Sequence, residues 1–157
     1  MEFLLALLGT WEGEGVASYP TIETFPYREH FVVRGRQDDD AVIYEQRTWT
    51  PGADGALSRP SHWETGFLIP QEDGSLLALT AHDPRTEVLR GGADRIDGGW
   101  RMTLESSSFS NDPRMTSDRR QLDLVGDTIR YGMDMATDRV GDLTVHLDGT
   151  LRRSADV

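Results

Sequence analysis

Apolar and polar residues alternate along most of the chain in short segments. The alternation is clear over residues 25–34, 62–69 and 143–153. A period of two is typical of β-strands that bury one face. Residues that favour turns, mainly Gly, Pro, Asn and Asp, separate the segments. The pattern predicts roughly ten short strands at the spacing found in β-sandwiches and barrels.

The breaks between segments are consistent with an all-β chain. Pro20 and Pro113 interrupt two runs, since proline cannot donate to a strand ladder. Gly126-Asp127 joins two apolar-rich runs and predicts a hairpin. Residues 3–8 predict one or two helical turns, and no longer amphipathic helix or repeat is visible. We therefore expect a single domain over residues 1–157, an antiparallel closed β-barrel similar to lipocalins and fatty-acid-binding proteins, with an internal ligand cavity.

The last predicted strand, residues 143–153, carries a single histidine. Regular alternation would place Leu143, Val145, Leu147 and Leu151 on one face. His146 would then lie on the opposite, polar face, unless a β-bulge changed the register.

The amino-acid composition limits the kinds of functional site that the chain can contain. The absence of cysteine excludes disulfides, thiolate nucleophiles and thiolate-ligated metals, so an iron site would use His, Met, Tyr or carboxylates. No apolar run approaches the ~20 residues of a membrane span. Residues 3–8 also lack the basic flank of a signal peptide. The expectation is a cytoplasmic protein without membrane contact.

The formal net charge is −11, and all 16 basic residues are arginine. An acidic surface repels phosphate backbones, which argues against nucleic-acid binding. It also repels small anions at long range, so an anion site has to be built locally from arginine side chains or backbone N–H groups.

Several motifs in register resemble the nitrobindin family, small haem proteins with a barrel like that of fatty-acid-binding proteins. Residues 9–15, Gly-Thr-Trp-Glu-Gly-Glu-Gly, match its GxWxGxG motif. The similarity continues over nearly the whole chain, through the segments 19–22, 25–27, 44–49, 62–67, 131–135 and 146–152.

The resemblance implies one haem b per chain, held by His146 as the axial iron ligand. It implies a ferric haem that binds nitric oxide and isomerises peroxynitrite to nitrate. It also places Thr21 near the haem and His62 on the distal wall, where His62 could hydrogen-bond an iron-bound anion or occupy the sixth position of the iron. The chain departs from the family pattern at residues 81–85, at residues 67–69 and at Gly149, positions that affect the cavity wall more than the iron ligand.

Other residues have less specific signals. Haem propionates need a nearby cation in an acidic protein, and Arg114, with Arg119 and Arg120 in or near the same loop, is the first candidate. Met133 and Met135 are expected to line the cavity rather than bind iron. His30 and His82 receive no role. A non-haem site from His62, Glu64 and His82 is disfavoured because the sequence does not bring their strands together.

Two functions from different classes remain. The first is a haem-dependent peroxynitrite isomerase, with His146 holding a partly solvent-accessible haem near an open end of the barrel. The alternative is a haem-free barrel that carries a fatty acid or another small apolar ligand. The sequence leaves the oligomeric state open, a homodimer included.

Overall fold

The computed structural model describes residues 2–35, 40–52 and 56–155. Within these residues a short helix precedes ten strands, and no helix is long and apolar enough to cross a membrane. The elements are α1 (Glu2–Leu7), β1 (Gly9–Tyr19), β2 (Ile22–Gly35), β3 (Val42–Pro51), β4 (Leu57–Pro70), β5 (Leu76–His82), β6 (Arg85–Ile96), β7 (Gly99–Ser110), β8 (Met115–Val125), β9 (Thr128–Thr137) and β10 (Thr144–Arg153).

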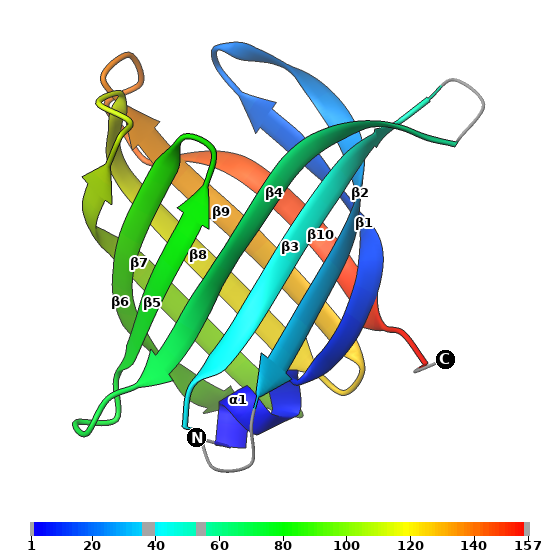
Figure 1. Ribbon diagram of the computed structural model, residues 1–157, viewed down its shortest axis with the longest axis vertical. Coiled ribbons are helices and arrows are strands. Elements are labelled where there is room, and N and C mark those ends of the chain that lie inside the picture. Colours follow the sequence, from blue (N-terminus) through cyan, green and yellow to red (C-terminus); the bar gives the residue numbers. More distant parts are fainter. Residues whose placement is uncertain (1, 36–39, 53–55, 156–157) are drawn as a thin grey trace.

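The described strands form one closed antiparallel barrel, which confirms the predicted fold class (Figure 1). Each strand pairs with its neighbours in sequence, and β1 closes the barrel by pairing with β10. This seam runs from Trp11 opposite Arg153 to Ala17 opposite Leu147. Closure leaves no open sheet edge in the described barrel and encloses an interior.

Helix α1 closes one end of the barrel (Figure 1). Its Phe3, Leu4 and Leu7 are buried in the main apolar core, and Trp11 Nε1 donates to the carbonyl oxygen of Leu7 at 2.9 Å. Arg153 lies 4.0 Å above the Trp11 ring and donates hydrogen bonds to the carbonyl oxygens of Ala6 and Leu8 at the end of the helix. The apolar core therefore fills the end of the barrel next to α1.

Close approach between strands explains one glycine of the first motif. A Cβ atom at Gly15 would lie 2.4 Å from the Tyr27 hydroxyl and 2.6 Å from the Asp148 carbonyl oxygen. Only glycine lets the β1 backbone pass this close to both neighbours.

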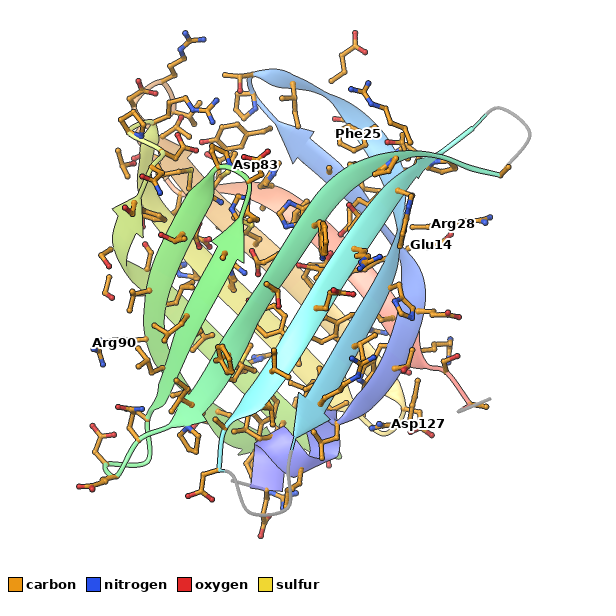
Figure 2. All side chains as sticks on the ribbon, viewed as in Figure 1. Glu14, Phe25, Arg28, Asp83, Arg90 and Asp127 are labelled. Atoms are coloured by element: carbon orange, nitrogen blue, oxygen red, sulfur yellow. The ribbon has the colours of Figure 1, made fainter. Side chains whose placement is uncertain are left out.

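The inner face of the barrel is more polar than a simple core would be. On β4, His62, Glu64 and Gly66 turn inward, while Trp63 and Phe67 are 62% and 47% exposed. Charged side chains such as Arg28, Arg90 and Asp127 point away from the outer wall (Figure 2). The barrel therefore has a mixed interior, with apolar residues near α1 and a polar wall further along.

Candidate functional site

A cavity of about 530 Å³ occupies the barrel interior. It reaches Leu7 and Leu151 near α1, and Thr21, Pro84 and Arg139 in the turns at the opposite end. Its volume is in the range of sites for small organic ligands. The cavity thus connects the mouth of the barrel with its core.

His146 lines this cavity because β10 contains a bulge. Val145 pairs with Asp134 and Leu147 pairs with Met133, so His146 is an additional residue opposite β9. Both His146 and Leu147 line the cavity, while Val145 is 55% exposed. The expected regular alternation, with Leu143 and Val145 on the leucine face, is therefore wrong at this end of the strand. A bulge redirects the histidine inward.

The contacts of His146 favour a neutral imidazole with a free nitrogen. Nδ1 lies 3.1 Å from the Ser18 carbonyl oxygen, and an N–H at this position donates to it. The Tyr19 ring meets the imidazole edge-on at 5.6 Å. Burial lowers the pKa of His146, and the hydrogen bond to Ser18 opposes this only in part. The proton is thereby fixed on Nδ1, and Nε2 keeps its lone pair.

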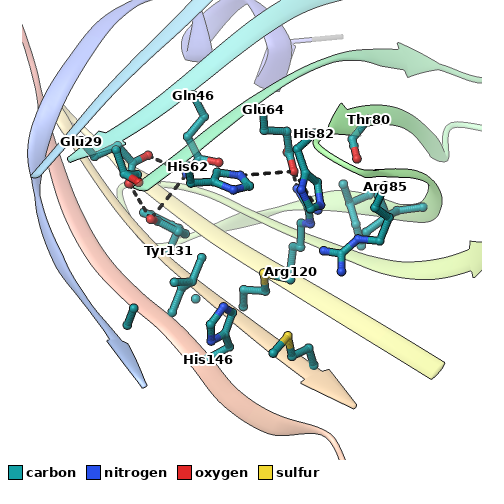
Figure 3. A pocket seen from close by; sticks show the side chains of 18 of the residues that line it. Glu29, Gln46, His62, Glu64, Thr80, His82, Arg85, Arg120, Tyr131 and His146 are labelled. Atoms are coloured by element: carbon teal, nitrogen blue, oxygen red, sulfur yellow. Dashed lines mark hydrogen bonds and ion pairs between the residues drawn. The ribbon is translucent and has the colours of Figure 1, made fainter. Parts of the chain in front are cut away.

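Two further histidines lie across the pocket from His146 (Figure 3). The rings of His62 on β4 and His82 on β5 pack against each other with centroids 4.9 Å apart. Their Nε2 atoms lie 3.8 Å from Glu64 and 4.0 Å from Glu87, respectively. The two imidazoles therefore form a histidine wall that faces His146.

Arg120 holds the carboxylates behind this wall. It binds both oxygens of Glu64, at 2.5 and 3.1 Å, and one oxygen of Glu87 at 2.8 Å. Tyr44 donates a hydrogen bond of 2.6 Å to the same Glu64. Burial alone would raise the pKa of Glu64, but the Arg120 charge and the hydrogen bonds that Glu64 accepts hold it well below its usual range. Glu64 is therefore a buried carboxylate that stays ionised.

A second polar cluster lies beside the first, since Gln46 is paired with Glu64 in the β3–β4 register. Tyr131 donates to Glu29 at 2.5 Å, Gln46 donates to Glu29 at 2.8 Å, and the Tyr27 and Tyr131 hydroxyls share a short hydrogen bond. Burial raises the pKa of Glu29 to about 7, although the two hydrogen bonds it accepts oppose the shift. Burial also raises the pKa of Tyr131 well above its usual value.

The mouth of the cavity carries arginine side chains. Thr21, in the turn between β1 and β2, and Arg114 both line it, as does Arg139. Arg114 is bound through Nε and Nη2 to Asp112 at 2.8 and 3.0 Å and is otherwise exposed. The expected loop position of Arg119 and Arg120 is wrong, because both lie within β8.

Sequence reasoning missed several residues of the site. Glu64 is paired with His82 in the β4–β5 register, so the strands of His62, Glu64 and His82 do come together. Even so, no described group of three such side chains is arranged to hold a metal ion. Glu29 was not considered, His82 received no role and Arg120 was expected in or near a loop, because polar residues on an alternating strand normally face solvent. Met133 and Met135 line the cavity as expected.

Comparison with known proteins places this site in context. Residues 1–153 match the family described as "THAP4-like, heme-binding beta-barrel domain". A peroxynitrite isomerase of Nocardia farcinica is 41% identical to the chain, over 96% of this chain and 88% of the relative. A peroxynitrite isomerase 1 of Rhodococcus jostii is 36% identical, over 96% and 82% respectively.

Solved structures show the same barrel. The crystal structure of Rv2717c from M. tuberculosis superposes with a TM-score of 0.86 and 29% identity, covering 98% of this chain and 96% of the other. A phycobiliprotein lyase from Guillardia theta, with a TM-score of 0.63 and 9% identity, covers 99% and 93% and shares the fold alone.

Proposed function

The chain belongs to the THAP4-like haem-binding β-barrel family, the nitrobindins, and we propose that it binds one haem b through His146 and isomerises peroxynitrite to nitrate at the ferric iron. Nitric oxide is the second ligand that we assign to this site. The names of the relatives support the isomerase activity, since those described above are called peroxynitrite isomerases.

The observation that carries the proposal is the state of His146. Its Nδ1 is engaged by the Ser18 carbonyl, and Nε2 has no hydrogen-bond partner among the described residues. A neutral imidazole held in this way is the usual single protein ligand of a haem iron that keeps its sixth position available. The neighbouring wall contains Met133, Met135 and Leu147, which suit the apolar face of a porphyrin. The residues present therefore fit a haem.

The remaining cavity residues have separate tasks. When bound, ferric haem supplies a Lewis-acidic centre that coordinates an oxyanion and weakens its O–O bond. His62 and His82 face His146 across the pocket and can donate a hydrogen bond to such an anion (Figure 3). Arg114 and Arg139 at the mouth can pair with carboxylates of the cofactor. Thr21 lines the cavity from the β1–β2 turn.

The buried arginines argue against the alternative of a fatty-acid carrier. A carboxylate ligand inside an apolar barrel needs an unpaired internal cation. Arg120 instead binds Glu64, Glu87 and Asp118, and Arg85 pairs with Glu87 and Asp112. Both inner arginines are thus already neutralised by side chains of the protein.

The replacement His146→Ala tests the proposal. We expect loss of haem binding, measured as loss of the Soret band and of its titration with ferric haem, because the variant lacks the iron ligand. Nitrate yield from peroxynitrite should fall to that of the protein-free solution. The matched control is His30→Ala, since His30 lies on β2 between the inward-facing Glu29 and Phe31 and outside the cavity lining. An unchanged Soret band in the His146 variant would refute the assignment.

A further inference from the structure

The charged cluster behind the histidine wall contains more carboxylates than cations. Glu64, Glu87 and Asp118 are 1%, 2% and 0% exposed. The cations among them are Arg120, whose side chain is 18% exposed, and the buried Arg85, which also lies 3.6 Å from Asp112. If all carboxyl groups were ionised, the interior would hold an uncompensated negative charge, which is strongly unfavourable away from water. Binding one proton removes this charge.

The hydrogen bonds indicate where such a proton is held. Arg120 occupies one oxygen of each carboxyl group, Asp118 Oδ2 at 3.2 Å and Glu87 Oε2 at 2.8 Å. Of the other two oxygens, Glu87 Oε1 is in close contact with Arg85 Nε, whereas Asp118 Oδ1 is buried and accepts no hydrogen bond. The two carboxyl groups are also close enough to hydrogen-bond each other. A single proton on Asp118 would satisfy Oδ1, the oxygen that has no partner.

The pair connects directly to the cavity wall. Glu87 Oε1 lies 4.0 Å from Nε2 of His82, and this nitrogen is also buried without a hydrogen-bond partner. His82 in turn packs on His62, and both rings line the cavity. Asp118, Glu87 and His82 therefore form a short path from the barrel wall to the ligand space.

The surrounding charges determine which carboxyl group is protonated. Burial raises the pKa of Asp118 to about 7; Arg120 opposes this shift, and the Glu87 charge adds to it. For Glu87 the effect of burial is outweighed by His82, Arg120 and Arg85, and its pKa is lowered to about 2. The ionisable groups that face the pair are Arg120 on β8, Arg85 on β6, Glu64 and His62 on β4, His82 on β5 and Tyr44 on β3.

We propose that Asp118 holds a proton that is delivered to His82 when an anion enters the cavity. The proposal rests on the proposed function in one respect, namely that the ligand is a small oxyanion. As the anion approaches, the O–H bond of Asp118 breaks, Glu87 takes up this proton and passes one to Nε2 of His82. The number of protons on the protein stays the same. The result is an imidazolium at the cavity wall and an ionised Asp118 behind it, so an interior rich in carboxylates can still receive an anion.

The first test measures the protonation state of Asp118. Aspartate carboxyl carbons are labelled with ¹³C in the full chain, and infrared spectra are recorded between about pH 5 and pH 9. We expect one protonated aspartate C=O band at neutral pH that disappears at higher pH. Asp118→Asn should lack it, while the amide oxygen can still bind Arg120. The control Asp123→Asn, on the same strand but paired with Arg101 outside the cavity, should retain it.

A second variant, Glu87→Gln, tests the same proton even if Asp118→Asn fails to fold. In Glu87→Gln the negative neighbour is removed, so the Asp118 band should disappear at a lower pH than in the wild type. Absence of a protonated aspartate in the wild type at neutral pH, or persistence of the band in Asp118→Asn, would overturn the proposal.

The last test follows the proton to His82 without haem. Nitrate serves as the anion, and the ¹⁵N shifts of labelled histidine are recorded in the haem-free full chain. In the wild type, His82 should shift towards the imidazolium form on addition of nitrate, and this shift should be lost in Asp118→Asn. An unchanged His82 in the wild type would overturn the proton transfer. Failure of ferric haem to bind the wild type would instead contradict the proposed function, so the two failures are distinguishable.

Discussion

At the residue scale, the chemistry of this barrel depends on where single protons are held. His146 is kept neutral by burial and by the Ser18 carbonyl, which accepts its Nδ1 proton. Glu64 is kept ionised by Arg120. Glu29, which lacks a buried cation of its own among the described residues, has a pKa raised to about 7. Similar carboxyl groups in one cavity thus hold different charges because their partners differ.

Glu29 gives a prediction for the pH dependence of stability. Its folded-state pKa lies above the unfolded value, so its contribution to stability is fully present below about pH 4.5 and is lost as the pH rises through about 7. Glu29→Gln removes this loss. Relative to the wild type, the variant should gain on the order of 3 kcal/mol between pH 4.5 and pH 8.

The measurement is urea denaturation of both proteins across this range of pH. Asp123→Asn is a suitable control: the Arg101 hydrogen bond lowers the pKa of Asp123, so this group is ionised in both states throughout the range and its replacement should leave the pH dependence unchanged. A difference between Glu29→Gln and wild type that does not vary with pH would contradict the assignment of a raised pKa.

At the scale of elements, the bulge in β10 decides whether the histidine faces the cavity. Deleting Val145 would restore regular alternation: Leu147 would stay opposite Met133, and His146 would move opposite Asp134, facing outward. We expect this variant to fold but not to bind haem, although it still contains the histidine. Circular dichroism checks the fold and the Soret titration checks the ligand. Retention of haem with unchanged affinity would show that the bulge is not needed.

The contact between β1 and β2 gives a second prediction at this scale. In Gly15→Ala the new methyl group would overlap the Tyr27 side chain and the Asp148 carbonyl. We expect a loss of about 1–3 kcal/mol in the free energy of unfolding. Gly141→Ala is the matched control, because no atom lies within 4 Å of the position of its Cβ. Equal stability of the two variants in urea would contradict the close approach.

The elements also show how far the sequence predicts the structure. Ten strands, the hairpin at Gly126 and the short helix follow from alternation and turn residues, which act locally. The inward direction of His146 and Glu64 does not, because a bulge changes the register and a binding cavity places polar residues inside. Glu29 and Arg120 were missed for the same reason. Periodicity reports that a strand has two faces, but not which face is enclosed.

At the scale of the whole molecule, the net charge of −11 surrounds a site proposed to take an anion. Long-range repulsion should slow the approach of peroxynitrite, and added salt should relieve it. We therefore expect the second-order rate of peroxynitrite decay on the haem-loaded protein to rise with ionic strength, as measured by stopped flow in sodium chloride solutions. A rate that falls with salt would mean that Arg114 and Arg139 at the mouth dominate the local field.

Barrel closure has a consequence for the order of folding. His146, the proposed iron ligand, lies on β10, and the Ser18 carbonyl that accepts from its Nδ1 lies on β1, almost the full length of the chain away. Contacts this distant in sequence form late, because the loop entropy must be lost before they can contribute. A nascent chain in which β10 has not yet left the ribosome cannot bind haem through His146. Haem binding would then be possible only in molecules in which β1 and β10 have already paired.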